Sequence, residues 1–254
     1  MKRIITAAVL IPAVLLAIFS NIPWVLLAFV AVIGLASWYE YANIMALDWL
    51  TLMLGATGGL ALLVIPIEHL ILPLVIFSLI ALTIPFREED LQAGLARAAL
   101  MFLGVVYIFG AMMAADYLGL LGKWLLLFAL LINWVGDTGA YYVGRRFGKH
   151  KLAPRISPGK SWEGAAASIV FAALFTCIGM HLFLGTDIRK AALFGILGNI
   201  AGQIGDLAES AMKRGAGVKD SGTLLPGHGG MLDRVDSALF TLPVALAIAR
   251  WVHL

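Results

Sequence analysis

Apolar residues dominate the chain in runs of roughly 18 to 25 residues, the length that a membrane-spanning helix needs. Short polar or aromatic segments separate the runs, and nine can be distinguished. These runs predict spans at residues 4–20, 23–43, 49–65, 67–85, 95–115, 124–144, 163–184, 190–211 and 235–252. They are not the alternating ten-residue runs of an outer-membrane barrel. The pattern therefore predicts an all-α, polytopic integral membrane protein with about nine transmembrane helices.

The composition agrees with this fold class. Of the 254 residues, 61% are hydrophobic and only 13% are charged, whereas a soluble domain is about 45–50% apolar and about 25% charged. The basic start of the chain, followed by an apolar run from Ile4, is similar to a signal peptide. No small-x-small cleavage site follows, so we interpret it as an uncleaved first span.

The distribution of basic residues predicts an orientation. With nine spans, only Lys123, Arg189, Lys190 and Arg250 of the 18 Lys and Arg residues fall on the side opposite to the N-terminus. Because basic residues are enriched in cytoplasmic loops, the N-terminus is predicted to be cytoplasmic. Two long polar loops, residues 145–162 and 212–234, then lie on that same face.

Two carboxylates occur inside predicted spans, where a charge is costly and usually functional. Asp137 precedes Arg145 by about 12 Å of helix, and Asp206 precedes Lys213 by about 10 Å. Both are therefore expected at a similar depth below the same face. Either each acid pairs with a base and fixes helix packing, or the two share a polar, metal-sized cavity that is open to the cytoplasm. We favour the cavity.

The two polar loops have the residues of a phosphate site. The first contains Ser157 and Lys160, and Ser161 can cap the next helix, whose N-terminus favours phosphate. In the second, glycines at 227, 229 and 230 allow backbone N–H groups to converge on an anion. Glu40, by contrast, is expected at a membrane interface with a structural role.

Residues 210–236 resemble the signature of the phosphatidate cytidylyltransferases, also called CDP-diacylglycerol synthases. The spacing is matched without departure by Ser210, Met212, Lys213, Arg214, Lys219, Asp220, Gly222, Leu225, Pro226, His228, Gly229, Gly230, Met231, Asp233, Arg234, Val235 and Asp236. Further resemblance lies in the segments around Asp137 and in residues 145–151 and 157–164.

This resemblance implies the reaction of CTP with phosphatidate to give CDP-diacylglycerol and pyrophosphate, with Mg²⁺ as cofactor. Two Mg²⁺ ions that bridge the nucleophile and the leaving oxygens would be one way to bring the two anions together. It also implies a homodimer in the inner membrane of a bacterium, with the active site facing the cytoplasm; nucleic acid is not among the expected partners. Residues 1–120 would form a membrane scaffold that could contribute to dimerisation. Residues 121–254 would form the catalytic region.

The resemblance also implies roles for individual residues. The predicted metal ligands are Asp206 and Asp233, followed by Asp137 and Asp236. Catalytic roles fall to Asp206, Asp233, Lys213, Lys219 and Arg234, of which the basic residues neutralise phosphate charge. Substrate binding falls to Ser157, Lys160, Arg145, Ser210, Arg214, His228, Gly229 and Gly230. The sequence leaves open how Asp206, Asp220, Asp233 and Asp236 divide these roles.

Two other functions compete with this one. A CTP-dependent lipid kinase of the dolichol-kinase (polyprenol) type would release CDP in place of pyrophosphate. An ion-coupled transporter could use Asp137 and Asp206 for coupling. A transporter is expected to have inverted repeats and interrupted helices, and it would leave the basic signature segment unexplained.

Overall fold

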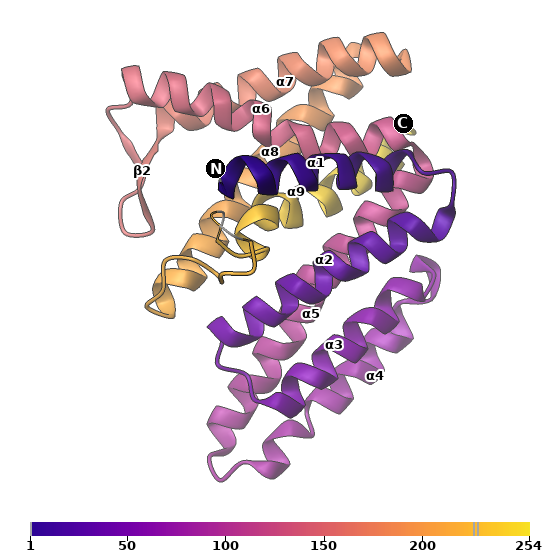
Figure 1. The fold of residues 1–254 in the computed structure, drawn as a ribbon, viewed down its shortest axis with the longest axis vertical. Coiled ribbons are helices and arrows are strands. Elements are labelled where there is room, and N and C mark those ends of the chain that lie inside the picture. Colours follow the sequence, from indigo (N-terminus) through magenta and orange to yellow (C-terminus); the bar gives the residue numbers. More distant parts are fainter. Residues whose placement is uncertain (1, 226, 228) are drawn as a thin grey trace. The chain divides into compact units, whose positions relative to one another are not determined.

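The computed structural model describes residues 2–225, 227 and 229–254, and these form an almost entirely helical protein (Figure 1). The prediction of an all-α fold is confirmed. The described residues contain the α-helices α1 (Lys2–Phe19), α2 (Pro23–Ile44), α3 (Trp49–Val64), α4 (Ile71–Ala81), α5 (Leu91–Leu121), α6 (Lys123–Phe147), α7 (Trp162–Leu184), α8 (Ile188–Gly215) and α9 (Leu232–Trp251).

Five of these helices are long and apolar enough to span a bilayer: α2 from Trp24 onward, α5, α6, α7 and α8. In the described part of the chain, the apolar stretches Ala8–Phe19, Trp49–Val64 and Ile71–Arg87 are shorter. The protein therefore has several candidate membrane helices. Nine spans and a cytoplasmic N-terminus stay predictions.

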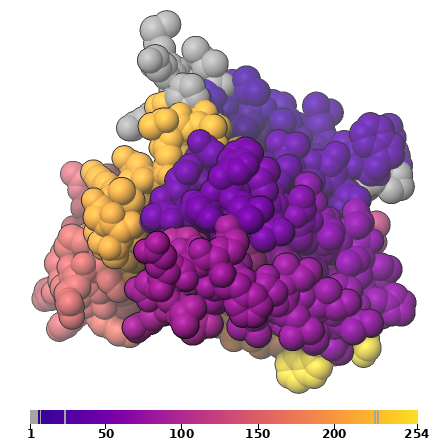
Figure 2. Space-filling view, turned by 90° about the horizontal axis from the view of Figure 1, so that it is seen from below, coloured from indigo at the N-terminus to yellow at the C-terminus, as the bar shows by residue number. Residues whose placement is uncertain are grey.

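The predicted continuous helix at 67–85 is wrong in detail. The segment consists of the 3₁₀ helix η1 (Ile67–His69), the short helix α4 and the 3₁₀ helix η2 (Ile84–Arg87). Pro85 lies in the first turn of η2, and it has no N–H with which to continue α4. Large apolar side chains of α4 are exposed, including Ile71 and Leu72. The surface of this part of the chain is coloured purple in Figure 2.

The chain divides into two compact units. The first consists of Met1–Ala17, Asn21–Met113 and Asp220–Asp233, and the second of Ile18–Ser20, Ala114–Lys219 and Arg234–Leu254. The segment Asp220–Asp233, here called the signature loop, therefore belongs to the unit that holds the N-terminal helices. The proposed division of roles between residues 1–120 and 121–254 stays a prediction.

Side-chain hydrogen bonds connect the helices of the first unit. The indole Nε1 of Trp38 on α2 donates to the carbonyl oxygen of Leu52 on α3 at 2.9 Å. The hydroxyl of Tyr41, also on α2, donates to the carbonyl oxygen of Leu100 on α5 at 2.9 Å. Both side chains are 1% exposed, so this face of α2 is buried against α3 and α5.

In the second unit, α6, α7 and α8 pack against one another. A β-hairpin connects α6 to α7 and consists of β1 (Lys151–Ala153) and β2 (Ser157–Ser161), with Lys151 opposite Ser161 (Figure 1). The hairpin was not predicted, because Pro158 and Gly159 are poor strand residues. The predicted cap is confirmed: the Ser161 hydroxyl accepts the N–H of Gly164 at 3.2 Å and begins α7.

Candidate active site

The second unit contains a cavity of about 470 Å³ that opens beside the β-hairpin. Its polar walls come from four elements. The polar side chains are those of Asp137, Tyr141 and Arg145 of α6, Lys160 and Ser161 of β2, Ser168 of α7 and Gln203 of α8. Three residues predicted from the sequence, Asp137, Arg145 and Lys160, are thus brought to one cavity although 23 positions of sequence separate the first from the last.

An ion pair connects Lys160 in this cavity to Asp206 on α8. The ammonium group of Lys160 lies 2.5 Å from Oδ2 of Asp206, and the hydroxyl of Ser210 donates to Oδ1 of Asp206 at 3.4 Å. The two charged side chains are 28% and 30% exposed. Asp206 is therefore a half-buried carboxylate that solvent and a substrate can still reach.

Three carboxylates of this unit lie close enough to interact electrostatically. The Asp206 carboxylate repels those of Asp137 on α6 and Asp236 on α9, and the Lys160 ammonium attracts both. Like charges held together in a poorly solvated site need a counter-charge. Lys160 supplies part of it.

The donor chemistry of this cluster suits a magnesium ion, which prefers carboxylate oxygens. Among the described residues, no three His, Cys, Asp or Glu side chains are arranged as a complete metal site. Such a site is not required, because Mg²⁺ commonly uses one or two carboxylates and takes its other ligands from water and substrate phosphates. One or two of the carboxylates of Asp137, Asp206 and Asp236 would be enough for such an ion, and their metal-binding role stays a prediction.

Lys213 was predicted to neutralise phosphate charge, but in the structure its ammonium group is already paired with a carboxylate. Its ammonium lies 2.5 Å from Oε2 of Glu209, one turn earlier on α8. Glu209 is 1% exposed and Lys213 is 9% exposed, so the pair is buried. The Lys213 charge also reaches Asp236. This position makes Lys213 a counter-charge inside the site before any substrate arrives.

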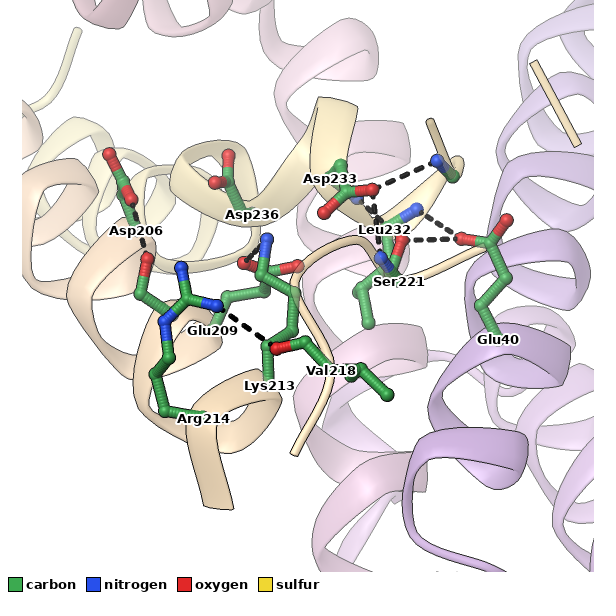
Figure 3. A network of polar contacts seen from close by, with 12 residues as sticks. Glu40, Asp206, Glu209, Lys213, Arg214, Val218, Ser221, Leu232, Asp233 and Asp236 are labelled. Atoms are coloured by element: carbon green, nitrogen blue, oxygen red, sulfur yellow. Dashed lines mark hydrogen bonds and ion pairs between the residues drawn. The ribbon is translucent and has the colours of Figure 1, made fainter. Parts of the chain in front are cut away.

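The remaining basic candidates of the second unit lie at its surface. The guanidinium of Arg214 donates to the carbonyl oxygen of Val218 at 3.1 Å (Figure 3). Arg145 donates to the Tyr141 hydroxyl at 2.8 Å at the cavity. Lys219 and Arg234 are exposed. These side chains are accessible to an anionic substrate, whereas Lys213 is not.

Ser157 and His228 complete the set of predicted substrate-binding residues. Ser157 is the first residue of β2 and pairs with Ala153 of β1, so it belongs to the same hairpin as Lys160. His228 lies outside the described residues.

Asp233 has a different environment, in the first unit. Its Oδ2 accepts the backbone N–H groups of Ser221 and Gly230, each at 2.9 Å, and its own N–H donates to the Ser221 hydroxyl at 3.2 Å. We expected the N–H of Gly230 to face a substrate anion, but it faces this carboxylate. Gly229 has a left-handed backbone, with φ +79°. The metal-binding role of Asp233 stays a prediction.

Two groups of residues at these sites were not predicted from the sequence. Ser168 and Gln203 line the cavity, and the only signal for them was a polar side chain inside an apolar run. Glu40 was expected at a membrane interface but is 1% exposed, and its Oε2 accepts hydrogen bonds from the signature loop (Figure 3). No local pattern connects Glu40 to a loop about 180 residues away in the chain.

Comparison with known proteins now decides the family. The sequence model of the cytidylyltransferase family matches residues 1–252. The chain belongs to the cytidylyltransferase family. The prediction of a nucleotidyltransferase is thereby confirmed, and the match includes the N-terminal helices as well as the segments that carry the resemblance.

Relatives of this cytidylyltransferase come from several bacteria. A protein of Staphylococcus aureus (strain COL) named phosphatidate cytidylyltransferase is 36% identical over 222 residues, 86% of this chain and 80% of the relative. Proteins of the same name are 45% identical over 127 residues in Haemophilus influenzae and 51% identical over 121 residues in Staphylococcus epidermidis (strain RP62A). These two alignments cover 44% and 46% of the relatives, so the chain spans about half the length of each.

Proposed function

We propose that this cytidylyltransferase converts CTP and phosphatidate to CDP-diacylglycerol and pyrophosphate. The main support for the proposal is the Asp206–Lys160 ion pair beside the cavity. The carboxylates of Asp137 and Asp236 interact electrostatically with both members of this pair. The names of the bacterial relatives supply the substrate class.

The reaction joins two anions, and this determines what the site must do. An oxygen of the phosphatidate phosphate forms a bond to the α-phosphorus of CTP, and the bond from that phosphorus to the bridging oxygen of the β-phosphate breaks, so pyrophosphate leaves. The second pKa of a phosphate monoester is about 6, so the nucleophile is already largely deprotonated at neutral pH. A strong general base is therefore unnecessary, and neutralisation and positioning dominate catalysis.

The residues of the second unit have the charges for this task. Arg145 and Lys160 line the cavity and would neutralise the triphosphate, and the exposed Arg214 would meet phosphate at the surface. Lys213 would act from inside the site through its charge on Asp236. Asp206, with Asp137 and Asp236, would hold Mg²⁺, which offsets phosphate charge and polarises the phosphoryl oxygens when bound.

The location of the site follows from its substrates. Phosphatidate lies in the bilayer and CTP in the cytosol, so the cavity would open to the cytoplasmic face of a bacterial inner membrane. The homodimer, and the lack of a nucleic-acid partner, stay predictions from the resemblance.

The test is a product assay with a matched pair of variants. Purified protein with CTP, phosphatidate and Mg²⁺ should release pyrophosphate, whereas a lipid kinase would release CDP. Asp206→Asn should lower turnover by about 10² or more, because it removes a charge from the proposed metal site.

Asp187→Asn is the control on the same helix. The Asp187 carboxylate caps α8 by accepting the N–H of Arg189 at 2.9 Å, and Asn caps as well as Asp does. Its activity should equal that of the wild type. Wild-type turnover by Asp206→Asn would refute the assignment of Asp206, and CDP without pyrophosphate would refute the reaction.

A further inference from the structure

Glu40 of α2 holds the signature loop at two points. Its Oε2 accepts the Ser221 hydroxyl at 3.0 Å and the backbone N–H of Leu232 at 2.8 Å. Ser221 directly follows Asp220, and Leu232 directly precedes Asp233. One carboxylate oxygen thus fixes the chain beside each of the two acids of this loop (Figure 3).

The loop backbone passes very close to this carboxylate. A Cβ atom on Gly222 would lie 2.5 Å from Oε1 of Glu40, and one on Gly230 would lie 2.3 Å from Oε2 and 2.0 Å from the Ser221 hydroxyl oxygen. A side chain at either position would have to displace the Glu40 carboxylate from its place against the loop. Two glycines of the family signature therefore allow the loop to pack closely against the Glu40 carboxylate as it is placed here, and this role differs from anion binding by their N–H groups.

The second oxygen of Glu40 shows that this arrangement is costly. Oε1 is buried and has no hydrogen-bond partner among the described residues. Burial of an unpaired polar oxygen lowers the free energy of unfolding, and an apolar side chain would avoid this. The carboxylate is therefore poorly explained by stability alone, whereas its hydrogen bonds to the loop give it a specific role.

We propose that Glu40 is a positioning residue that fixes the conformation of the signature loop for nucleotidyl transfer. The predicted loss of activity rests on the proposed function, whereas the predicted change in the conformation of the loop does not. Glu40 acts through Ser221 and Leu232, and through them sets the backbone from which Asp220 and Asp233 project.

Three variants test this role. Glu40→Ala removes the acceptor and should lower kcat by about 10²-fold, because small displacements of site residues have effects of that size. The KM for CTP should change by no more than about threefold, since no binding group is removed. Glu40→Gln keeps the chain length and one acceptor oxygen, and it should restore kcat to within about threefold of the wild type. Hydrogen–deuterium exchange of peptides covering residues 220–233 should be faster in Glu40→Ala and unchanged in Glu40→Gln.

Ser37→Ala is the matched control. Ser37 is on the same helix, one turn before Glu40, is 0% exposed, and its hydroxyl has no hydrogen-bond partner in the described structure. Removing that hydroxyl should leave both activity and exchange as in the wild type. The proposal would be overturned by unchanged loop exchange in Glu40→Ala, by faster exchange throughout the protein, or by a Glu40→Gln variant as inactive as Glu40→Ala. If the wild type itself lacks transferase activity, the proposed function fails, and the exchange data still decide whether Glu40 holds the loop.

Discussion

Lys160 is the residue on which the charge balance of the second unit depends. Its ammonium is 2.5 Å from Asp206 and also attracts Asp137 and Asp236. In a partly buried site such an interaction is less screened than on the surface. The same ammonium lines the cavity proposed for CTP, so one side chain offsets the carboxylates and, in the proposed reaction, would face the incoming phosphates.

Replacement of Lys160 by alanine should therefore impair catalysis strongly. We expect kcat/KM for CTP to fall by about 10²-fold, the usual effect of removing one electrostatic contact to a reacting phosphate or carbonyl. Arg155→Ala removes the same charge from the exposed turn of the same hairpin and should have little effect. Steady-state kinetics with varied CTP measures both variants, and equal losses in the two would show that only net charge matters.

A buried hydrogen-bond network joins three helices of the second unit, α6, α8 and α9. Nδ2 of Asn133 on α6 donates to the Thr241 hydroxyl of α9 at 2.9 Å, and that hydroxyl donates to the carbonyl oxygen of Gly198 on α8 at 3.0 Å. A Cβ atom on Gly202 would lie 2.0 Å from the Asn133 oxygen. Small residues allow these helices to approach, and the polar side chains then pair between them.

A double-mutant cycle should measure this network. Asn133→Ala and Thr241→Val should show a coupling free energy of about 0.6 to 1.7 kcal/mol, between the average and the maximum found for interhelical hydrogen bonds in a membrane protein. Thr138→Val with Thr241→Val is the control pair, since the Thr138 hydroxyl bonds to Trp134 of its own helix and shares no partner with Thr241. Unfolding of the protein in detergent gives the free energies, and a coupling near zero for the first pair would contradict the network.

Local signals identified most elements, and long-range contacts account for what they missed. The helices follow from apolar runs and, at α7, from the predicted cap Ser161. The hairpin at 151–161 and the burial of Glu40 depend on partners distant in sequence, which no local pattern encodes. Asp137 and Asp206 could be grouped because helix geometry converts residue number into depth. The backbone hydrogen bonds of Asp233 could not be foreseen from residue type.

The orientation of the whole molecule can be tested at the two ends of one helix. α7 has 23 residues and is therefore about 34 Å long, enough to cross a hydrocarbon core of about 30 Å. The basic hairpin precedes it and residues 185–187 follow it. The excess of basic residues predicts that the hairpin is cytoplasmic and that residues 185–187 lie on the opposite side.

Cysteine labelling can decide this orientation, because Cys177 is the chain's single cysteine and can be replaced by serine. In that background, Arg155→Cys should react with a membrane-impermeant maleimide in inside-out vesicles only, and Thr186→Cys in right-side-out vesicles only. Permeabilised vesicles, in which both positions should react, provide the control. Reaction of both from one side would mean that α7 does not cross the membrane. The reverse pattern would place the hairpin, and with it Lys160 and the proposed CTP site, outside the cytoplasm.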